Sequence, residues 1–170
     1  MPAFAIQTER DQTMVDRLSE RFGTAAFTHE RLWDTLCITV PKEQAHAMLA
    51  FMKEDLGFHF LTSLCGMHFP GTEQELGVVY FLHDMRHGHR IRVKTGMTLP
   101  TAELPTVTDL WPSANWMERE TWDFFGIRFT GHPNLKRILN MEDFPAFPLR
   151  KEYPLEDPTR EDKDNTFFGR

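Results

Sequence analysis

Hydrophobic residues recur at helical spacing in two stretches of the N-terminal half. In residues 8–22 and 41–56 they fall three or four positions apart, and Gly23 and Gly57 follow the two stretches. Pro41 opens the second stretch, at the first position of a helix, where its missing amide proton costs nothing. The pattern predicts one helix in each stretch, with an apolar face turned towards a core.

Five further segments are rich in β-branched and aromatic residues, which is typical of strands. They cover residues 25–29, 32–40, 58–68, 76–84 and 90–97. The order helix-strand-strand-helix-strand-strand-strand is not a strict alternation of strands and helices. We therefore predict an α+β fold, in which residues 1–97 form a two-layer core domain with helices on one face of a mixed sheet.

The last of these predicted strands alternates strictly between two kinds of residue. One set is apolar or small and the other is basic: Ile91, Val93 and Thr95 against Arg90, Arg92 and Lys94. Successive side chains of a strand point to opposite faces of the sheet. The alternation therefore predicts a sheet with one buried face and one solvated, basic face.

The pattern changes after residue 97. Residues 98–112 contain three prolines and predict a connector that crosses the surface. Residues 113–125 predict a helix that is apolar on most sides and must be covered on most sides. Five of the eleven prolines then fall within residues 133–158. We predict that residues 113–170 form this helix and an extended arm, which has no core of its own and wraps a partner protein.

Charge and cysteine content narrow the class of protein further. The net charge of −6 over 170 residues argues against binding nucleic acid through bulk charge. No uncharged apolar run reaches the ~20 residues that a membrane span needs. The N-terminus has no basic segment followed by an apolar one, so we expect no signal peptide. Cys37 and Cys65 do not make a disulfide framework, and we expect reduced thiols.

A histidine cluster offers one candidate metal site. His83, His87 and His89 could bind zinc or copper if a turn brought the three imidazoles together. Arg86 and Arg90 stand beside them and disfavour a dication. We therefore favour an exposed hairpin turn and keep a free-standing metal-binding protein as an alternative.

Motifs of self-contained enzymes are missing. The sequence has no glycine-rich dinucleotide loop, no Walker loop, no nucleophile elbow and no Cys-x-x-Cys pair. Cys65 and His68 stand at ligand spacing, but a second pair is missing, so we interpret Cys65 as a thiol in the core. We predict that this chain carries no catalytic, cofactor-binding or metal-binding residues.

The predicted helix over 113–125 carries the densest group of charges. Glu118 and Asp123 could be paired carboxylates for acid–base chemistry. At roughly 100° per residue they lie about 140° apart around the helix and do not share a face. Arg119 and Asp123 stand at i and i+4, so we predict an ion pair between them.

Three blocks in this half resemble the signature of the C subunit of the proton-pumping NADH-quinone oxidoreductase, respiratory complex I. Residues 108–127 read TDLWPSANWMERETWDFFGI, residues 129–139 read FTGHPNLKRIL and residues 148–154 read PLRKEYP. The blocks occur in the order of the family. One departure is that Ala146 and Phe147 stand where the family commonly has Gly-His.

The resemblance implies a scaffold subunit that binds no flavin and no iron–sulfur cluster. Such a subunit sits in the quinone-reducing module of the peripheral arm, and the complex transfers electrons from NADH to quinone and pumps protons. Its partners are a quinone-site subunit resembling a hydrogenase large subunit and the subunit that carries the last iron–sulfur cluster. The location is the cytoplasmic side of the inner membrane of a bacterium. An alternative is the equivalent subunit of a related membrane-bound hydrogenase or ferredoxin-linked quinone reductase.

The resemblance also implies which residues contact the partners. The predicted interface comprises Glu118, Arg119, Glu120, Trp122, Asp123, Phe124, Phe125, Gly126, Gly131, His132, Pro133, Arg137, Phe147, Arg150 and Lys151. Among them, the polar pins would be Arg119, Asp123, Arg137, Arg150 and Lys151. The apolar anchors would be Trp122, Phe124, Phe125 and Phe147, and Gly126 and Gly131 would permit turns.

Overall fold

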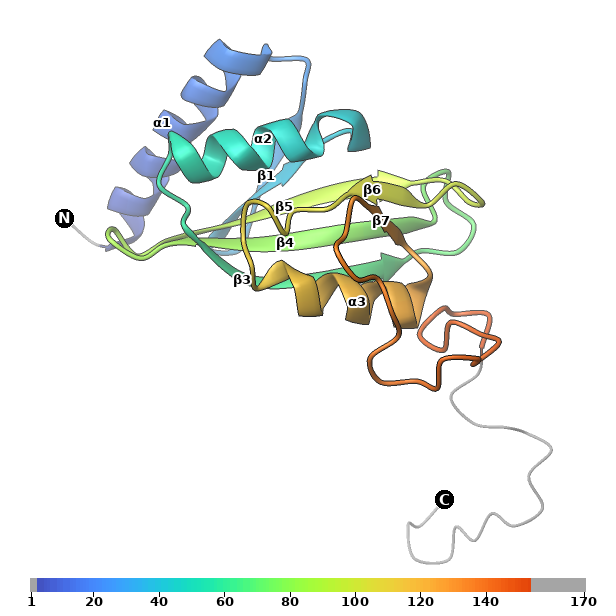
Figure 1. The fold of residues 1–170 in the computed structure, drawn as a ribbon. Helices are drawn as coiled ribbons and strands as arrows, with labels where there is room; N and C mark the ends of the chain where they lie inside the picture. Colours follow the sequence, from blue (N-terminus) through green and yellow to red (C-terminus); the bar gives the residue numbers. More distant parts are fainter. Residues whose placement is uncertain (1–2, 154–170) are drawn as a thin grey trace, which may run out of the picture.

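Three helices and seven strands make up the described part of the chain (Figure 1). The structure is a computed structural model that describes residues 3–153, with the backbone alone for residues 3–7. The helices are α1 (Ala3–Phe22), α2 (Lys42–Glu54) and α3 (Ala114–Phe125). The strands are β1 (Thr28–Leu32), β2 (Thr35–Thr39), β3 (Phe60–His68), β4 (Leu76–Asp84), β5 (His89–Met97), β6 (Glu103–Pro105) and β7 (Arg128–Thr130). None of these helices combines the length and the apolar character that crossing a bilayer requires.

Five strands form one mixed sheet in the order β1-β2-β5-β4-β3. β2 and β5 run parallel, with Leu36 opposite Ile91, and the other neighbours are antiparallel. The parallel pair needs a long connection, and the chain between β2 and β5 supplies it as α2, β3 and β4. The predicted α+β fold and its order of elements are confirmed.

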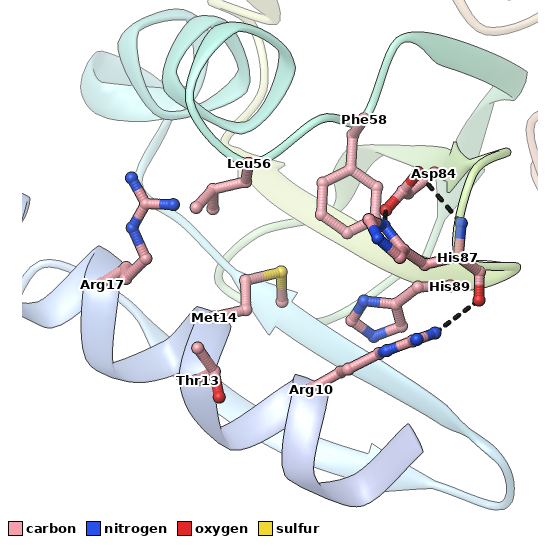
Figure 2. A pocket seen from close by; sticks show the side chains of 9 residues that line it. All are labelled: Arg10, Thr13, Met14, Arg17, Leu56, Phe58, Asp84, His87 and His89. Atoms are coloured by element: carbon pink, nitrogen blue, oxygen red, sulfur yellow. Dashed lines mark hydrogen bonds and ion pairs between the residues drawn. The ribbon is translucent and has the colours of Figure 1, made fainter. Parts of the chain in front are cut away.

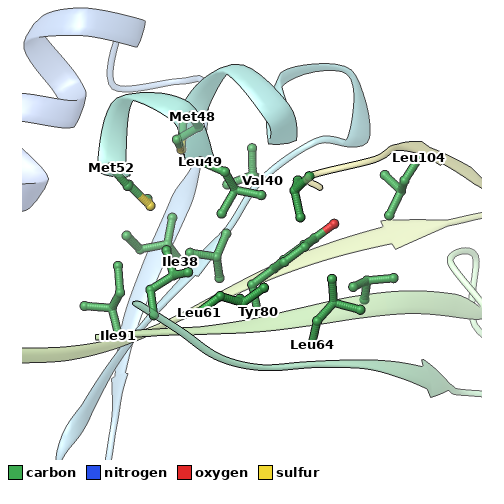
Figure 3. Packing of buried hydrophobic residues seen from close by; sticks show 14 of the residues in the cluster. Ile38, Val40, Met48, Leu49, Met52, Leu61, Leu64, Tyr80, Ile91 and Leu104 are labelled. Atoms are coloured by element: carbon green, nitrogen blue, oxygen red, sulfur yellow. The ribbon is translucent and has the colours of Figure 1, made fainter. Parts of the chain in front are cut away.

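The core lies between the helices and one face of the sheet (Figures 1 and 3). α2 turns Met48, Leu49 and Met52 towards Ile38 and Tyr80 of the sheet, and each of the five is at most 1% exposed. Burying a side chain of this size contributes roughly 1.5–3 kcal/mol. The apolar face predicted for the second helix therefore holds it against the sheet.

β5 shows the predicted alternation. Ile91, Val93 and Thr95 are buried on the face that meets the helices, Arg90 is exposed, and Arg92 and Lys94 are half-buried. In the register of the sheet, the three basic residues stand opposite His83, Phe81 and Val79 of β4, respectively. These side chains belong to the second face of the sheet.

Three predicted boundaries differ from the structure at the N-terminal side. α1 begins at Ala3, ahead of the predicted start at residue 8, and the strands expected over 25–29 and 32–40 are displaced to β1 and β2. The cause of the displacement is the hairpin turn at Trp33, whose φ of 57° is in the left-handed region. Few residues other than glycine adopt this backbone, and hydrophobic periodicity does not reveal it.

Two short strands extend the core beyond the predicted boundary at residue 97. β6 lies within the predicted connector, and it pairs in parallel with β7, Leu104 standing opposite Phe129. Both side chains are buried, and they join the same core cluster as Ala114 and Ile127. Strands of three residues are too short for their periodicity to be recognised.

Candidate partner-binding site around helix α3

α3 ends at a glycine that no other residue can replace without a clash. Gly126 has a φ of 71° and its amide donates to the carbonyl of Trp122 at 2.8 Å. A Cβ at this position would lie 2.6 Å from Nη2 of Arg150 and 2.7 Å from the ring of Phe147. The close approach brings residues 147–150 onto the end of the helix, where the Leu149 amide donates to the Phe124 carbonyl at 3.2 Å.

Asp123 is the main anchor of the C-terminal segment, by which we mean residues 131–153. Its carboxylate is fully buried and accepts a hydrogen bond from Nη1 of Arg137 at 2.7 Å. It also accepts from the amides of Ile138, Leu139 and Asn140 at 2.8–3.0 Å and from the Asn140 side chain at 3.0 Å. One side chain of α3 thus fixes the backbone of the segment at three consecutive residues, 138–140.

The protonation of Asp123 follows from these contacts. Burial alone would raise the pKa of the carboxyl group. The hydrogen bonds from Asn140, Arg137 and Leu139 stabilise the charged form and outweigh burial, so the pKa lies well below its usual range. Asp123 is therefore a charged structural anchor at neutral pH.

Arg137 completes the anchor from the other side. Its guanidinium also donates to the carbonyls of Phe144 and Ala146, at 2.7 and 3.2 Å. It lies 5.6 Å from the ring centroid of Trp122 and 5.2 Å from that of Phe147, distances typical of cation–π contacts. The Phe147 that departs from the family pattern thus packs on two arginines of this chain, Arg137 and Arg150.

The predicted ion pair between Arg119 and Asp123 is wrong. Arg119 instead donates to the carbonyls of Lys136 and Arg137, both at 3.0 Å, and stacks over Trp116 at 5.0 Å. Asp123 faces Arg137, which comes from the segment and brings further donors with it. A tertiary partner that offers a complete set of hydrogen bonds outcompetes the exposed i,i+4 pair.

Glu118 holds a different part of the chain. Its buried carboxylate accepts from Oγ1 of Thr106 at 2.6 Å and from the amide of Val107 at 2.7 Å, so it ties α3 to the connector. Burial raises the pKa of Glu118 to about 7, although these hydrogen bonds act in the opposite direction. The predicted separation of Glu118 and Asp123 onto different faces agrees with these contacts, since each carboxylate serves a different loop.

The side chain of His132 is buried beside Glu118, with its Nε2 atom 4.0 Å from the Glu118 carboxylate. The same Nε2 donates to the carbonyl of Asn115 at 3.1 Å, and Nδ1 accepts from the amide of Asn134 at 3.0 Å. The imidazole thus joins the start of α3 to the start of the C-terminal segment. Gly131 precedes it with a φ of 81°, which lets the chain turn after β7.

The end of the segment is attached to the sheet. Nε of Arg150 donates to the carbonyl of Phe125 at 2.7 Å, and the amide of Lys151 donates to Nδ1 of His68 on β3 at 2.8 Å. Phe125 itself packs directly against Gly66 of β3, where a Cβ would overlap its ring. These contacts join α3, the segment and the sheet edge into one unit.

Five large hydrophobic side chains are exposed on α3 and the C-terminal segment. They are Trp116, Leu139, Met141, Leu149 and Tyr153, with Leu139 at 65% and Met141 at 70% exposure. None of them is among the predicted interface residues. Leu139 and Met141 flank Asn140, whose amide and side chain both bind Asp123, and the backbone of this stretch faces the helix. Their apolar type was the signal that the sequence offered.

The structure places the remaining predicted interface residues as follows. Glu120, Pro133 and the Lys151 side chain are exposed, whereas Trp122 and Phe124 are half-buried on α3. The contact of any of these residues with a partner stays a prediction. The predicted arm beyond residue 153 lies outside the described residues.

The histidine cluster does not converge. His87 donates from Nδ1 to Asp84 at 2.5 Å, and the buried His89 bonds through Nε2 to Asp11 of α1 at 2.6 Å. Both line a pocket of about 300 Å³ between α1 and the β4–β5 turn, shown in Figure 2, whereas His83 does not. Within residues 3–153, no three His, Cys, Asp or Glu side chains are grouped to hold a metal ion.

The interpretation of Cys65 as a core thiol is wrong. Its side chain is exposed, because it stands on the second face of the sheet.

Comparison with known proteins gives the family. The family described as "Respiratory-chain NADH dehydrogenase, 30 Kd subunit" matches residues 38–159. The chain belongs to this family. The match spans α2, β3 to β7, α3 and the C-terminal segment, so the resemblance carried by the three sequence blocks is confirmed.

Similar proteins of bacteria carry the name that the sequence blocks indicated. The C subunit of the NADH-quinone oxidoreductase of Methylobacterium sp. (strain 4-46) is 40% identical over 146 residues, which cover 85% of this chain and 67% of that protein. Its counterpart in Citrifermentans bemidjiense is 40% identical over 147 residues, which cover 86% of this chain and 91% of that protein.

Two solved structures share the fold of this family member. The trypsin-resistant fragment (1–134) of Nqo5 superposes with a TM-score of 0.65 at 32% identity, covering 72% of this chain and 99% of the fragment. A chain of the membrane-bound sulfane sulfur reductase, an archaeal respiratory membrane complex, superposes with a TM-score of 0.72 at 27% identity, covering 85% of each chain.

Proposed function

We propose that this chain is a scaffold subunit of the proton-pumping NADH-quinone oxidoreductase and has no catalytic residues of its own. It stands in the quinone-reducing module of the peripheral arm, on the cytoplasmic side of the inner membrane of a bacterium. It contributes to electron transfer from NADH to quinone by holding its partner subunits in place. Membership in the family of the 30 Kd subunit supports this proposal.

The main support for the proposal is that the C-terminal segment has a fixed backbone and exposed hydrophobic side chains. Buried polar groups, chiefly Asp123 and Arg137, fix its backbone against α3. The same segment exposes Leu139, Met141 and Leu149. Large exposed hydrophobic side chains on a fixed backbone are typical of a protein interface. We infer that this surface binds the quinone-site subunit resembling a hydrogenase large subunit, near the subunit with the last iron–sulfur cluster.

The carboxylates near this surface support a structural role. Asp123 accepts five hydrogen bonds on its carboxylate, and Glu118 binds the connector, so both are engaged within the chain. A general acid or base needs a free position towards a substrate. Neither carboxylate therefore has a position free for acid–base catalysis. From the family, we further propose that partner subunits bind the flavin and the iron–sulfur clusters.

The test is assembly of the complex with variants of the exposed surface. Native membranes carrying a tagged chain are extracted gently, and native electrophoresis with an in-gel NADH dehydrogenase stain follows. Met141→Asp should weaken binding of the chain by about 2–4 kcal/mol, which is roughly 30- to 1000-fold, because it places a carboxylate in an apolar interface. Gln44→Asp, on the exposed side of α2, adds the same charge and should assemble normally.

Each result has a distinct meaning. An NADH-active band that contains the parent chain and the Gln44→Asp variant but not the Met141→Asp variant supports the proposal. A Met141→Asp chain that assembles as fully as the parent contradicts the role of this surface.

A second candidate is the equivalent subunit of a related complex that takes electrons from another donor. The similarity to a chain of the membrane-bound sulfane sulfur reductase favours it. A large band that contains the tagged chain without NADH activity would support this candidate over the first.

A further inference from the structure

The second face of the five-stranded sheet carries a pattern of its own. The register of the strands places Phe60, His83 and Arg90 in one row across β3, β4 and β5. The next row holds Ser63, Phe81 and Arg92. This face therefore carries Phe60 and Phe81 on β3 and β4, next to basic residues along β5.

A pocket of about 420 Å³ lies at one end of this face, and the side chains of Phe60, Phe81 and Met85 contribute its apolar lining. Phe60 and Met85 are exposed, at 49% and 66%. His83 and Arg90 are the ionisable residues among its lining residues, and none of that lining is a carboxylate. The pocket can thus hold an apolar side chain of another protein, and Arg90 places a positive charge beside it.

The two arginines next to the pocket have no acidic partner among the described residues. Lys94, further along β5, pairs with Glu30 at 3.5 Å, whereas neither Arg90 nor Arg92 forms an ion pair there. Arg92 lies over the ring of Phe81, 5.8 Å from its centroid. In a chain with a net charge of −6, this is a local site of uncompensated positive charge beside exposed hydrophobic surface.

We propose that this face is a second docking surface, separate from α3 and the C-terminal segment, and that it takes an acidic segment of a partner subunit. A large apolar side chain of that segment enters the pocket between Phe60, Phe81 and Met85. An Asp or Glu next to it pairs with Arg90 and Arg92, which fixes the register of the contact. The inference rests on the proposed function in that it requires a multisubunit complex.

Thiol protection tests this proposal in the intact complex. Thr62 is exposed and lines the pocket, so Thr62→Cys in a Cys65→Ser background gives one reporter thiol on this face, the native Cys37 being fully buried. The rate of labelling by a charged maleimide is compared for the isolated chain and for the complex. We expect a rate at least tenfold lower in the complex. Gln44→Cys on α2, in the same background, is the matched control and should be labelled at similar rates in both.

A photo-crosslinking amino acid at position 62 then identifies the occupant. The expected product is a link to a segment of another subunit in which a large apolar residue neighbours Asp or Glu. The variant with Arg90→Glu and Arg92→Glu should bring the labelling rate of Thr62→Cys in the complex back to within twofold of that in the isolated chain.

The outcomes separate this inference from the proposed function. Unchanged labelling of Thr62→Cys in a complex that contains the chain overturns the docking surface and leaves the scaffold role intact. A crosslink to a second copy of this chain, or to a segment without carboxylates, also overturns it. If the chain is found in no complex at all, both proposals fail.

Discussion

Replacing Asp123 by asparagine is the most direct test of the anchor between α3 and the C-terminal segment. The change keeps the size of the side chain and removes its charge. The oxygen near Arg137 accepts from two donors, and the other accepts from the amides of Ile138, Leu139 and Asn140. An asparagine has an NH₂ group in place of one oxygen. In either orientation, this group faces at least two donors.

The expected cost follows from the burial of the groups left behind. Breaking a buried ion pair by removing one partner costs about 3–5 kcal/mol, because the remaining charge stays uncompensated. The side chain of Arg137 is only 8% exposed, so water does not replace the lost carboxylate while the segment remains closed. The segment should therefore open about 200- to 5000-fold more often in the variant.

Amide hydrogen exchange measures this opening residue by residue. The amides of Ile138, Leu139 and Asn140 should lose protection by the same factor, while those of β4 in the sheet change little, because the opening is local. Asp109→Asn makes the same chemical change at an exposed pair with His46 and should have little effect. Exchange at residues 138–140 that accelerates less than tenfold would refute the anchor.

The pH dependence of this anchor has a defined sign. Because the pKa of Asp123 is lowered in the folded chain, its contribution to stability is present above the ordinary carboxyl pKa of about 4. It is lost only when the pH falls through the much lower pKa of the folded state. The amides of residues 138–140 should therefore stay protected at pH 4, and early loss of protection there would contradict the charged anchor.

Three further substitutions test single contacts. Burial raises the pKa of Glu118 from 4.5 to about 7. Its contribution of ~3 kcal/mol to the free energy of unfolding is therefore full below pH 4.5 and is lost as the pH rises through 7. Glu118→Gln should abolish this loss of stability with rising pH. Urea unfolding at pH 5 and 8 should show this slope in the parent alone, and a flat parent would disprove it. Gly126→Ala should reduce the free energy of unfolding by at least about 1–2 kcal/mol and should speed tryptic cleavage at Arg150, because the added methyl group displaces Phe147. The control is Gly23→Ala, where φ is also positive (88°) but no atom lies near the added methyl group, and it should not speed that cleavage. Gly66→Ala should reduce the free energy of unfolding by roughly 1–3 kcal/mol and lower the midpoint of thermal unfolding, since the added methyl group pushes out Phe125. An unchanged midpoint would show that α3 can shift freely.

The strands and helices of the first hundred residues could be predicted because their signals are local. The alternation along β5 fixed which residues face the core, and the structure buries Ile91 and Val93 accordingly. The turn at Trp33 could not be predicted, since it depends on one residue in an uncommon backbone conformation. β6 and β7 form only because each finds the other across residues 103–130, which no local pattern encodes.

The family could likewise be read from the sequence, but the roles of its motif residues could not. Arg119 and Asp123 have the spacing of an ion pair, and only the folded segment shows that Asp123 pairs with Arg137 while Arg119 binds backbone carbonyls. Leu139 and Met141 look like ordinary hydrophobic residues in the sequence. Their exposure follows from the hydrogen bonds that turn their backbone towards α3.

The sequence by itself therefore determined the α+β class, the face of each amphipathic element and the family of this protein. Those properties follow from periodicity and from motif blocks, both of which are carried by neighbouring residues. The tertiary structure alone decided which groups donate hydrogen bonds to the buried carboxylates of Asp123 and Glu118 and which hydrophobic side chains stay exposed. The reason is that the hydrogen-bond donors for Asp123 and Glu118 lie up to 17 residues away in the sequence. When their backbone amides turn towards α3, the neighbouring side chains of Leu139 and Met141 are left facing outwards.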